Sequence, residues 1–164
     1  EIIVVDDFSA DRSLEKIMEF DSLIKILKNK KNEGLSFSRN TGIKKAKGKF
    51  IVMLDSDDYL AENFLFITGL FLESNNWDAA ATDYFKVNLK GKIIKKESAI
   101  KNPIACGILF KKKCLEKIKL YNKNLRINEE VDLMKRFQRK FKLGYINLPL
   151  YRYTKHKKSL TGIN

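Results

Sequence analysis

Two apolar runs that each end in carboxylates are the feature that most restricts the fold of this chain. The first, EIIVVDD, ends at Asp6 and Asp7, and the second, FIVMLDSDD, begins at Phe50 and ends at Asp58. A continuous run of β-branched and apolar residues is typical of a strand buried on both faces of a parallel sheet. Ligands of open α/β sheets bind beyond the carboxyl ends of the strands. Both runs therefore predict strands that lead into a binding site.

Helical and extended patterns alternate between these runs. We expect a helix in SADRSLEKIMEF capped by Ser9 or Asp11, a strand near residues 23–28, a helix in GLSFSRNTGIKKAKG that ends at Gly48, and a helix in AENFLFITGLFLES. Alternation of strands and helices is typical of a mostly parallel sheet flanked by helices. The fold class that we predict is therefore α/β.

The pattern changes after Trp77. WDAAATDYFKV and LKGKIIKKE predict an antiparallel hairpin, FKKKCLEKI a short helix, and YINLPLYRY a closing strand. NEEVDLMKRFQRKFKLG predicts a longer helix that Asn128 caps and whose apolar stripe consists of Val131, Met134, Phe137 and Phe141. No linker or internal repeat interrupts these patterns, so we predict a single domain.

Composition excludes several classes of protein. With 164 residues, 44% hydrophobic and 11% aromatic, the chain is long and apolar enough to bury a core. No apolar run reaches the roughly 18 residues needed to cross a bilayer, and no signal peptide is visible. Cys106, Cys114 and a single histidine do not form the spacing of a zinc site or a disulfide framework, which favours a reducing cytoplasm.

The net charge of +13 predicts an affinity for polyanions such as anionic lipid headgroups or phosphorylated ligands. We do not expect a nucleic-acid partner, because no nucleic-acid-binding motif accompanies the charge. An alternative is that the lysines form an ordinary solvated surface. We expect a cytoplasmic protein that works at the inner face of the membrane.

Three carboxylates within four residues, at Asp55, Asp57 and Asp58, repel one another unless a cation lies among them. In an extended turn Asp55 and Asp57 point the same way. Mg²⁺ and Mn²⁺ are typically held by one or two carboxylates together with substrate phosphates and water. The alternative is a helix cap: Asp57 or Asp58 would cap a helix that starts near Ala61, which accounts for one carboxylate of the three.

Two chemistries fit the acidic strand ends. The first is phosphoryl transfer to Asp55 in a response-regulator receiver domain. The spacing between Asp7 and Asp55 and the Lys101-Asn102-Pro103 segment favour this interpretation. Such domains end near 120 residues, which leaves the acidic helix at Glu129 without a role. The second is glycosyl transfer, in which a metal stabilises the leaving diphosphate and a general base takes the proton of the acceptor hydroxyl.

Four segments resemble motifs of family 2 glycosyltransferases. EIIVVDDFSADRS is similar to their EIIVVDDGSTDxS, and NEGLSFSRNTGIKKAKGKFIVMLDSDD is similar to the long block that links a central Arg-Asn pair to a final D-x-D-D. INEEVDLMKRF resembles a later E-D-x-D-L-x-x-R segment, and YRYTKHKKSLT resembles the closing Y-R-x-x-x-x-S-x-T. The segments cover nearly the whole chain in the family's order, and the block from Asn32 to Asp58 is the specific part.

The resemblance implies a GT-A fold and an inverting transferase that uses a nucleotide-diphosphate sugar with Mn²⁺ or Mg²⁺. The first half, residues 1–75 or so, would bind the nucleotide, and residues from about 76 to 164 would face a glycan or lipid-linked acceptor in polysaccharide synthesis. The implied donor-binding residues are Asp7, Ser9, Arg39, Asp55 and Asp58. The implied metal ligands are Asp57, Asp55 and His156, and the implied catalytic residues are Glu130, as the general base, and Glu129.

Three departures from the family pattern bear on activity. Phe8 replaces a glycine in the first turn, and Glu130 replaces the aspartate of the E-D pair. The longer side chain displaces the carboxylate by about 1 Å, and a misplacement of that size can lower a rate on the order of 10²-fold. The family begins one strand and one helix before Glu1, so we expect a chain that lacks this part. A non-catalytic remnant of such an enzyme is the remaining alternative.

Overall fold

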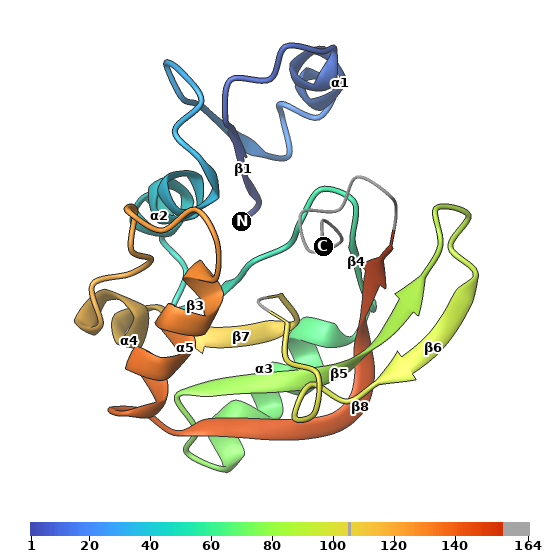
Figure 1. Cartoon of the computed structure of the whole chain (residues 1–164), viewed down its shortest axis with the longest axis vertical. Helices are drawn as coiled ribbons and strands as arrows, with labels where there is room; N and C mark the ends of the chain where they lie inside the picture. The colour runs from blue at the N-terminus through green and yellow to red at the C-terminus, as the bar shows by residue number, and fades with distance from the viewer. Residues whose placement is uncertain (105, 156–164) are drawn as a thin grey trace. The chain divides into compact units, whose positions relative to one another are not determined.

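The computed structural model describes residues 1–104 and 106–155, and these residues form two compact units (Figure 1). The first unit consists of Glu1–Ile51 and Lys112–Arg139, and the second contains Val52–Lys111 together with the chain from Lys140 onward. Each unit is therefore built from two separate stretches of sequence. The boundaries of the units differ from the predicted division near residue 75, because the later helices return to the first stretch of the chain.

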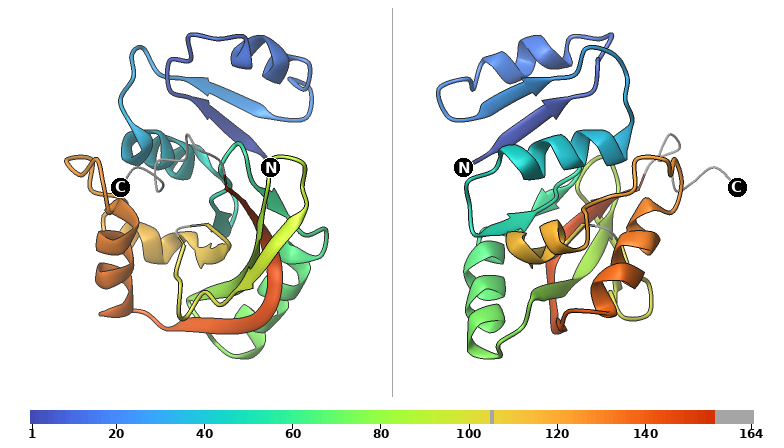
Figure 2. Two further views of the ribbon diagram at one scale, coloured as in Figure 1. Left: turned by 45° about the vertical axis from the view of Figure 1, so that its right-hand side comes forward. Right: turned by 90° about the vertical axis from the view of Figure 1, so that its left-hand side faces the viewer.

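The first unit has an α/β arrangement. Strands β1 (Ile3–Asp6) and β2 (Lys25–Lys28) pair in parallel, and helix α1 (Ser13–Met18) connects them (Figure 2). Helix α2 (Leu35–Lys45) packs against β1, and α4 (Lys112–Lys117) and α5 (Glu129–Gln138) complete the unit. The parallel pairing joined by a helix confirms the prediction for this part of the chain. Strand β3 (Phe50–Val52) carries the chain into the second unit.

The second unit is built on a mixed sheet. Strand β5 (Ala79–Val87) pairs in parallel with β8 (Leu143–Thr154) and antiparallel with β6 (Ile93–Glu97) and β7 (Ile108–Lys111). The short strand β4 (Tyr59–Leu60) pairs antiparallel with β8, and helix α3 (Phe64–Ser74) packs on β5 and β8. The hairpin that we predict after Trp77 is confirmed, and the sheet contains more antiparallel pairing than the sequence indicates.

Several predicted helix ends are wrong. Asn128 precedes α5 but its side chain makes no capping hydrogen bond, and α2 ends before Ala46 rather than at Gly48. The buried face of α5 consists of Glu129, Leu133 and Phe137, whereas Val131 is 44% exposed. An acid therefore occupies a position on the buried face, and the apolar stripe that we expected from sequence is displaced around the helix.

Among the residues that the structure describes, no helix combines the length and apolar character needed to cross a membrane.

Candidate functional site

The carboxyl end of β1 places Asp7 in a dense set of hydrogen bonds. Its Oδ1 accepts bonds from Asn29 Nδ2 and from the backbone N–H of Glu33, both at 2.8 Å, and its Oδ2 accepts one from the N–H of Gly34 at 2.8 Å. Burial raises the pKa of Asp7, but the hydrogen bonds from Asn29 and the two backbone amides outweigh burial and hold it below its usual value. Asp7 is thus an anion that orders the loop leading into α2.

The turn after Asp7 contains the predicted Ser9. Ser9 is exposed, and its backbone N–H donates to Oδ1 of Asp6 at 3.1 Å. Asp6 is buried, and its Oδ2 has no hydrogen-bond partner among the described residues. Between these residues Phe8 adopts a positive φ of 66° and leaves 54% of its surface exposed. The glycine of the related motif matches this backbone conformation, which side chains disfavour.

Arg39 of α2 forms a buried ion pair with Glu129, the first residue of α5. Arg39 Nη1 lies 3.7 Å from Glu129 Oε1, and the two side chains are 8% and 9% exposed. The Arg39 guanidinium also lies over the ring of Tyr121 at 5.4 Å. Burial raises the pKa of Glu129, and the neighbouring Glu130 carboxylate contributes in the same direction while Arg39 opposes it. The structure thus brings together two of the predicted site residues that are 90 positions apart in sequence.

A second contact of α2 fixes the segment before α5. Asn40 Nδ2 donates to the carbonyl of Tyr121 at 2.8 Å, and the Tyr121 N–H donates to Asn40 Oδ1 at 2.9 Å. Arg136 of α5 donates to the carbonyls of Ile118 and Leu120. Glu130, the predicted general base, is half-buried on the helix that these contacts hold. Its role as the general base rests on the resemblance.

The acidic turn in the second unit contains three carboxylates in different surroundings. Asp57 is exposed, Asp55 is half-buried, and Asp58 is only 7% exposed. Asp58 Oδ2 accepts a hydrogen bond from the Tyr151 hydroxyl at 2.6 Å, and its Oδ1 accepts one from the Thr154 N–H at 2.7 Å. The predicted helix cap is wrong, since α3 begins at Phe64 and the Asp58 oxygens accept bonds from β8 instead.

The chemistry of this turn fits a hard divalent cation that substrate phosphates help to hold. Burial, the largest cause, and the smaller effects of the Asp57 and Asp55 charges raise the pKa of Asp58 to about 6 against the opposing hydrogen bonds from Thr154 and Tyr151. The three carboxylates lie within four residues, and a cation would relieve the repulsion among them. No group of three or more metal-binding side chains occurs within residues 1–104 and 106–155. Mg²⁺ and Mn²⁺ usually take one or two protein carboxylates, and Asp55 and Asp57 are the carboxylates of the turn that could serve.

One predicted site residue cannot be placed, and three residues that contact the site were not predicted. His156 lies outside the described residues, so its predicted metal role has no structural counterpart here. Sequence reasoning missed Asn29, Tyr151 and Thr154. Asn29 follows β2 directly, as Asp7 follows β1, so its place at a strand's carboxyl end was a usable signal. Nothing local in the sequence marks Tyr151 or Thr154 as partners of Asp58, since they lie more than 90 positions away.

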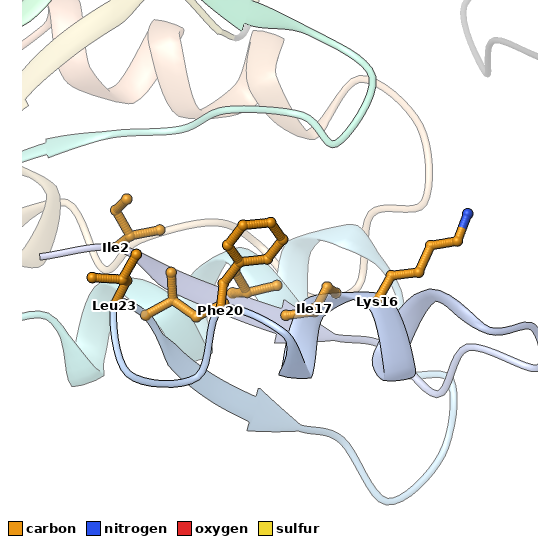
Figure 3. A pocket seen from close by; sticks show the side chains of 7 residues that line it. Ile2, Lys16, Ile17, Phe20 and Leu23 are labelled. Atoms are coloured by element: carbon orange, nitrogen blue, oxygen red, sulfur yellow. The ribbon is translucent and has the colours of Figure 1, made fainter.

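One pocket of the first unit is lined mainly by apolar side chains. It has a volume of about 390 Å³ and an apolar lining from β1, α1 and the segment before β2, with Lys16 as its one charged side chain (Figure 3). A diphosphate is usually held by several cations or hydrogen-bond donors, and this lining offers only Lys16. The lining is therefore a poor match for a diphosphate. The full lining consists of Ile2, Val4, Lys16, Ile17, Phe20, Leu23 and Ile24.

Comparisons with known proteins bear on the family of this chain. The family model described as "Glycosyl transferase family 2" matches residues 1–143. An uncharacterized glycosyltransferase of Rickettsia conorii is 45% identical over 96 residues, which is 57% of this chain and 16% of the relative. The Escherichia coli enzyme WfgD, named UDP-Glc:alpha-D-GlcNAc-diphosphoundecaprenol beta-1,3-glucosyltransferase, is 36% identical over 114 residues, 66% of this chain and 45% of the relative.

Solved structures show the same fold. The crystal structure of Staphylococcus aureus TarS residues 1–349 in complex with UDP matches 96% of this chain with a TM-score of 0.80 at 20% sequence identity. The match covers 52% of the TarS chain. The chain thus spans about half or less of the length of each of these relatives. The receiver-domain alternative, which rested on Asp55 and the spacing from Asp7, receives no support from the family match.

Proposed function

Because the chain belongs to glycosyl transferase family 2, we propose that it takes part in the transfer of a sugar from a nucleotide-diphosphate sugar to an acceptor hydroxyl, with inversion at the anomeric carbon. The observation that carries the proposal is the acidic turn, in which Asp58 is buried and bonded while the exposed Asp57 and half-buried Asp55 remain at the surface. Such an arrangement presents two carboxylates to a metal diphosphate without requiring a complete protein cage.

We propose a UDP-sugar as the donor. The name of WfgD includes UDP-Glc, and TarS has been crystallised with UDP and with UDP-GlcNAc. Asp7 and Arg39 are the residues of the first unit that we assign to the donor's nucleotide by resemblance, and Ser9 lies in the same turn as Asp7. Asp7 keeps its negative charge at neutral pH, since its pKa is lowered. A carboxylate of this kind accepts hydrogen bonds from the N–H groups of a nucleobase.

The metal that we propose is Mn²⁺ or Mg²⁺, with Asp57 and Asp55 as its protein ligands. When bound, such an ion neutralises charge that develops on the diphosphate leaving group. The chain's own residues then have two tasks. The acidic turn orients the donor, and a carboxylate of α5 accepts the proton of the attacking hydroxyl as the new carbon–oxygen bond forms and the bond to the diphosphate breaks.

Glu130 is the general base that we propose, with Glu129 in a supporting role. Glu129 is buried against Arg39, whereas Glu130 follows it in the first turn of α5 and is half-buried. A base must reach both the substrate and, afterwards, the solvent, which favours the less buried residue. Glu129 instead fixes the start of the helix on which the base stands.

For the acceptor we propose a glycan or a lipid-linked sugar in polysaccharide synthesis. The acceptor in the name of WfgD is a diphosphoundecaprenol-linked sugar. A membrane-borne acceptor fits a cytoplasmic protein whose net charge of +13 draws it to anionic lipids at the inner face of the membrane.

The test is calorimetric titration of the chain with UDP and UDP-sugars in the presence and absence of Mn²⁺. We expect Mn²⁺-dependent binding that falls at least about tenfold in Asp57→Ala, a loss of about 1.4 kcal/mol. Asp21→Ala, which removes an exposed carboxylate outside the site, is the matched control and keeps wild-type affinity. Wild-type-like binding in Asp57→Ala would refute the metal assignment. No nucleotide binding by the wild type would favour the non-catalytic remnant.

A further inference from the structure

The acidic turn is fastened to the last part of β8 by side-chain and backbone contacts. The Tyr151 hydroxyl donates to Asp58 Oδ2 at 2.6 Å, the Thr154 N–H donates to Asp58 Oδ1 at 2.7 Å, and the Thr154 hydroxyl donates to the carbonyl of Asp57. A turn within the segment adds a bond from the Asp58 N–H to the Asp55 carbonyl at 3.1 Å. All of these atoms belong to the second unit.

The environment of Asp58 is that of a structural carboxylate. Asp58 is 7% exposed and Tyr151 is fully buried, and each Asp58 oxygen already accepts a short hydrogen bond. Each oxygen could accept a second hydrogen bond, but at 7% exposure the carboxylate offers a donor molecule little surface to approach. Asp57, by contrast, is exposed on the same turn. Neighbouring carboxylates thus have distinct surroundings, set by their contacts with β8.

Two neighbouring segments, at Leu60 and Gly107, pack closely against Tyr151. Leu60 of β4 pairs with Tyr151 of β8, directly after the acidic turn. Gly107 has a positive φ of 74°, and a Cβ added there would lie 3.2 Å from the Tyr151 Cβ. A side chain at residue 107 would therefore both strain the backbone and press on Tyr151. The absence of a side chain at residue 107 thus leaves room for the inner part of the Tyr151 side chain.

We propose that Tyr151 and Thr154 are positioning residues that act through Asp58 to set the orientation of Asp55 and Asp57 toward the donor's metal diphosphate, and that Asp58 itself does not touch the donor. This inference rests on the proposed function. It changes the role of Asp58, which the resemblance places among the donor-binding residues. It also gives the Tyr-Arg-Tyr-Thr segment a task that the sequence does not reveal.

A hydroxyl deletion separates this role from simple core packing. Tyr151→Phe keeps the buried ring and removes the hydroxyl that donates to Asp58. Tyr145→Phe is a matched control, because Tyr145 lies on the same strand and its hydroxyl donates to Asp83, a carboxylate that is 2% exposed and outside the acidic turn. Both substitutions remove a bond between a tyrosine and a buried aspartate, and Tyr145→Phe also removes the bonds of its hydroxyl to Ser98 Oγ and the Ala99 N–H, both at 3.1 Å. The control is therefore expected to lose at least as much stability as Tyr151→Phe.

The readouts are Mn²⁺ affinity by electron paramagnetic resonance, Mn²⁺-dependent UDP affinity by calorimetry, and unfolding in urea. We expect the dissociation constants for Mn²⁺ with UDP to rise about tenfold in Tyr151→Phe, about 1.4 kcal/mol, and to stay within about twofold of the wild type in Tyr145→Phe. Equal effects of the two variants, or no effect of Tyr151→Phe, would overturn the proposal. Absence of binding in the wild type would instead count against the proposed function.

Two further variants keep the test decisive where Tyr151→Phe folds poorly. Asp58→Asn retains an oxygen that accepts the Thr154 N–H and an amide that pairs with the Tyr151 hydroxyl, so we expect it to keep most of the affinity that Asp57→Ala loses. A loss as large as that of Asp57→Ala would show direct contact between Asp58 and the ligand.

Thr154→Val keeps the shape and the backbone N–H but removes the bond to the Asp57 carbonyl, and we expect a several-fold loss of Mn²⁺–UDP affinity. Unchanged affinity in Thr154→Val would remove Thr154 from the proposal.

Discussion

Phe8 occupies a backbone conformation that L-amino acids disfavour. Its φ is 66°, and its side chain is 54% exposed, so little apolar burial compensates for the conformation. The left-handed region costs a non-glycine residue roughly 1–2 kcal/mol. Glycine adopts it freely but loses more chain entropy on folding. This residue therefore carries strain that the related glycine would not.

We predict that Phe8→Gly raises the free energy of unfolding by about 0.5–1 kcal/mol, measured by urea denaturation. Ala10→Gly in the same turn is the control. Ala10 has no positive φ, and its replacement is expected to lower stability by a few tenths to about 1 kcal/mol through chain entropy alone. Equal losses in both variants would show that Phe8 contributes packing that its exposure does not reveal.

The Arg39–Glu129 pair illustrates that burial affects the stability contribution of an ion pair more than the distance between its atoms does. Its atoms lie 3.7 Å apart and are nearly inaccessible to solvent, whereas Arg12 Nε and Glu15 Oε2 are only 2.7 Å apart but largely exposed. Water screens the exposed pair, and an exposed ion pair contributes about 0–1 kcal/mol. Removal of one partner from a buried pair leaves an uncompensated charge, which costs about 3–5 kcal/mol.

We therefore predict a large loss of stability, about 3 kcal/mol or more, for Arg39→Met, and a change below about 0.5 kcal/mol for Arg12→Met. The double variant Arg39→Met with Glu129→Gln removes both charges, and we expect it to recover more than half of the loss. Thermal and urea unfolding provide the measurement. A double variant no more stable than Arg39→Met alone would show that packing on Tyr121, not charge, accounts for the loss.

At the level of elements, β8 depends on a close contact between Gly144 and Trp77. A Cβ placed on Gly144 would lie 1.8 Å from Trp77 Cδ2, well below any contact distance. Gly69 in α3 is the opposite case, since a Cβ there meets nothing within 4 Å. Residue 144 must therefore be a glycine for steric reasons, whereas residue 69 has space for a side chain.

We predict that Gly144→Ala destabilises the protein by about 1–3 kcal/mol or more through overpacking, and that Gly69→Ala stabilises it by about 0.5–1 kcal/mol through helix propensity. Unfolding in urea measures both. Trp77→Leu in the Gly144→Ala background makes space and is expected to restore part of the loss. A tolerated Gly144→Ala would mean that the indole moves aside at little cost.

The ends of elements were harder to predict than their existence. The parallel β1–β2 pair and the β5–β6 hairpin follow from apolar periodicity, because burial of one face dictates a repeat along the chain. The buried face of α5 could not be predicted from apolar periodicity, because Glu129 is buried through its ion pair with Arg39 and displaces the apolar stripe. Periodicity treats an acid as a surface residue, and only a partner from another element reverses that assignment.

At the level of the whole molecule, the net charge of +13 includes exposed lysines of the first unit at the end of α2 and in α4. The end of α2 and the start of α4 meet there, as Lys112 donates from its N–H to the Lys49 carbonyl at 2.9 Å and from Nζ to the Ala46 carbonyl at 2.7 Å. We define the basic surface by its exposed lysines: Lys44, Lys45, Lys47, Lys49, Lys113 and Lys117.

We predict that the protein binds vesicles containing anionic phospholipid at low salt and is released by about 0.3–0.5 M salt, measured by co-sedimentation. Replacement of Lys44, Lys45 and Lys47 by Glu should abolish binding. The same change of net charge at Lys90, Lys92 and Lys155, exposed lysines of the second unit, should weaken binding only partly. Equal effects of both triple variants would assign the attraction to net charge rather than to the basic surface.

The sequence by itself determined the α/β class, the family and the position of the acidic turn, because these depend on local periodicity and on motifs with fixed spacing. The tertiary structure alone decided which carboxylate of the turn is buried, since Tyr151 and Thr154 reach Asp58 from more than 90 residues away. It also decided that Arg39 faces Glu129. Hydrogen bonds and ion pairs between distant segments leave no periodic signal in the chain, so they appear only when the fold brings the partners together.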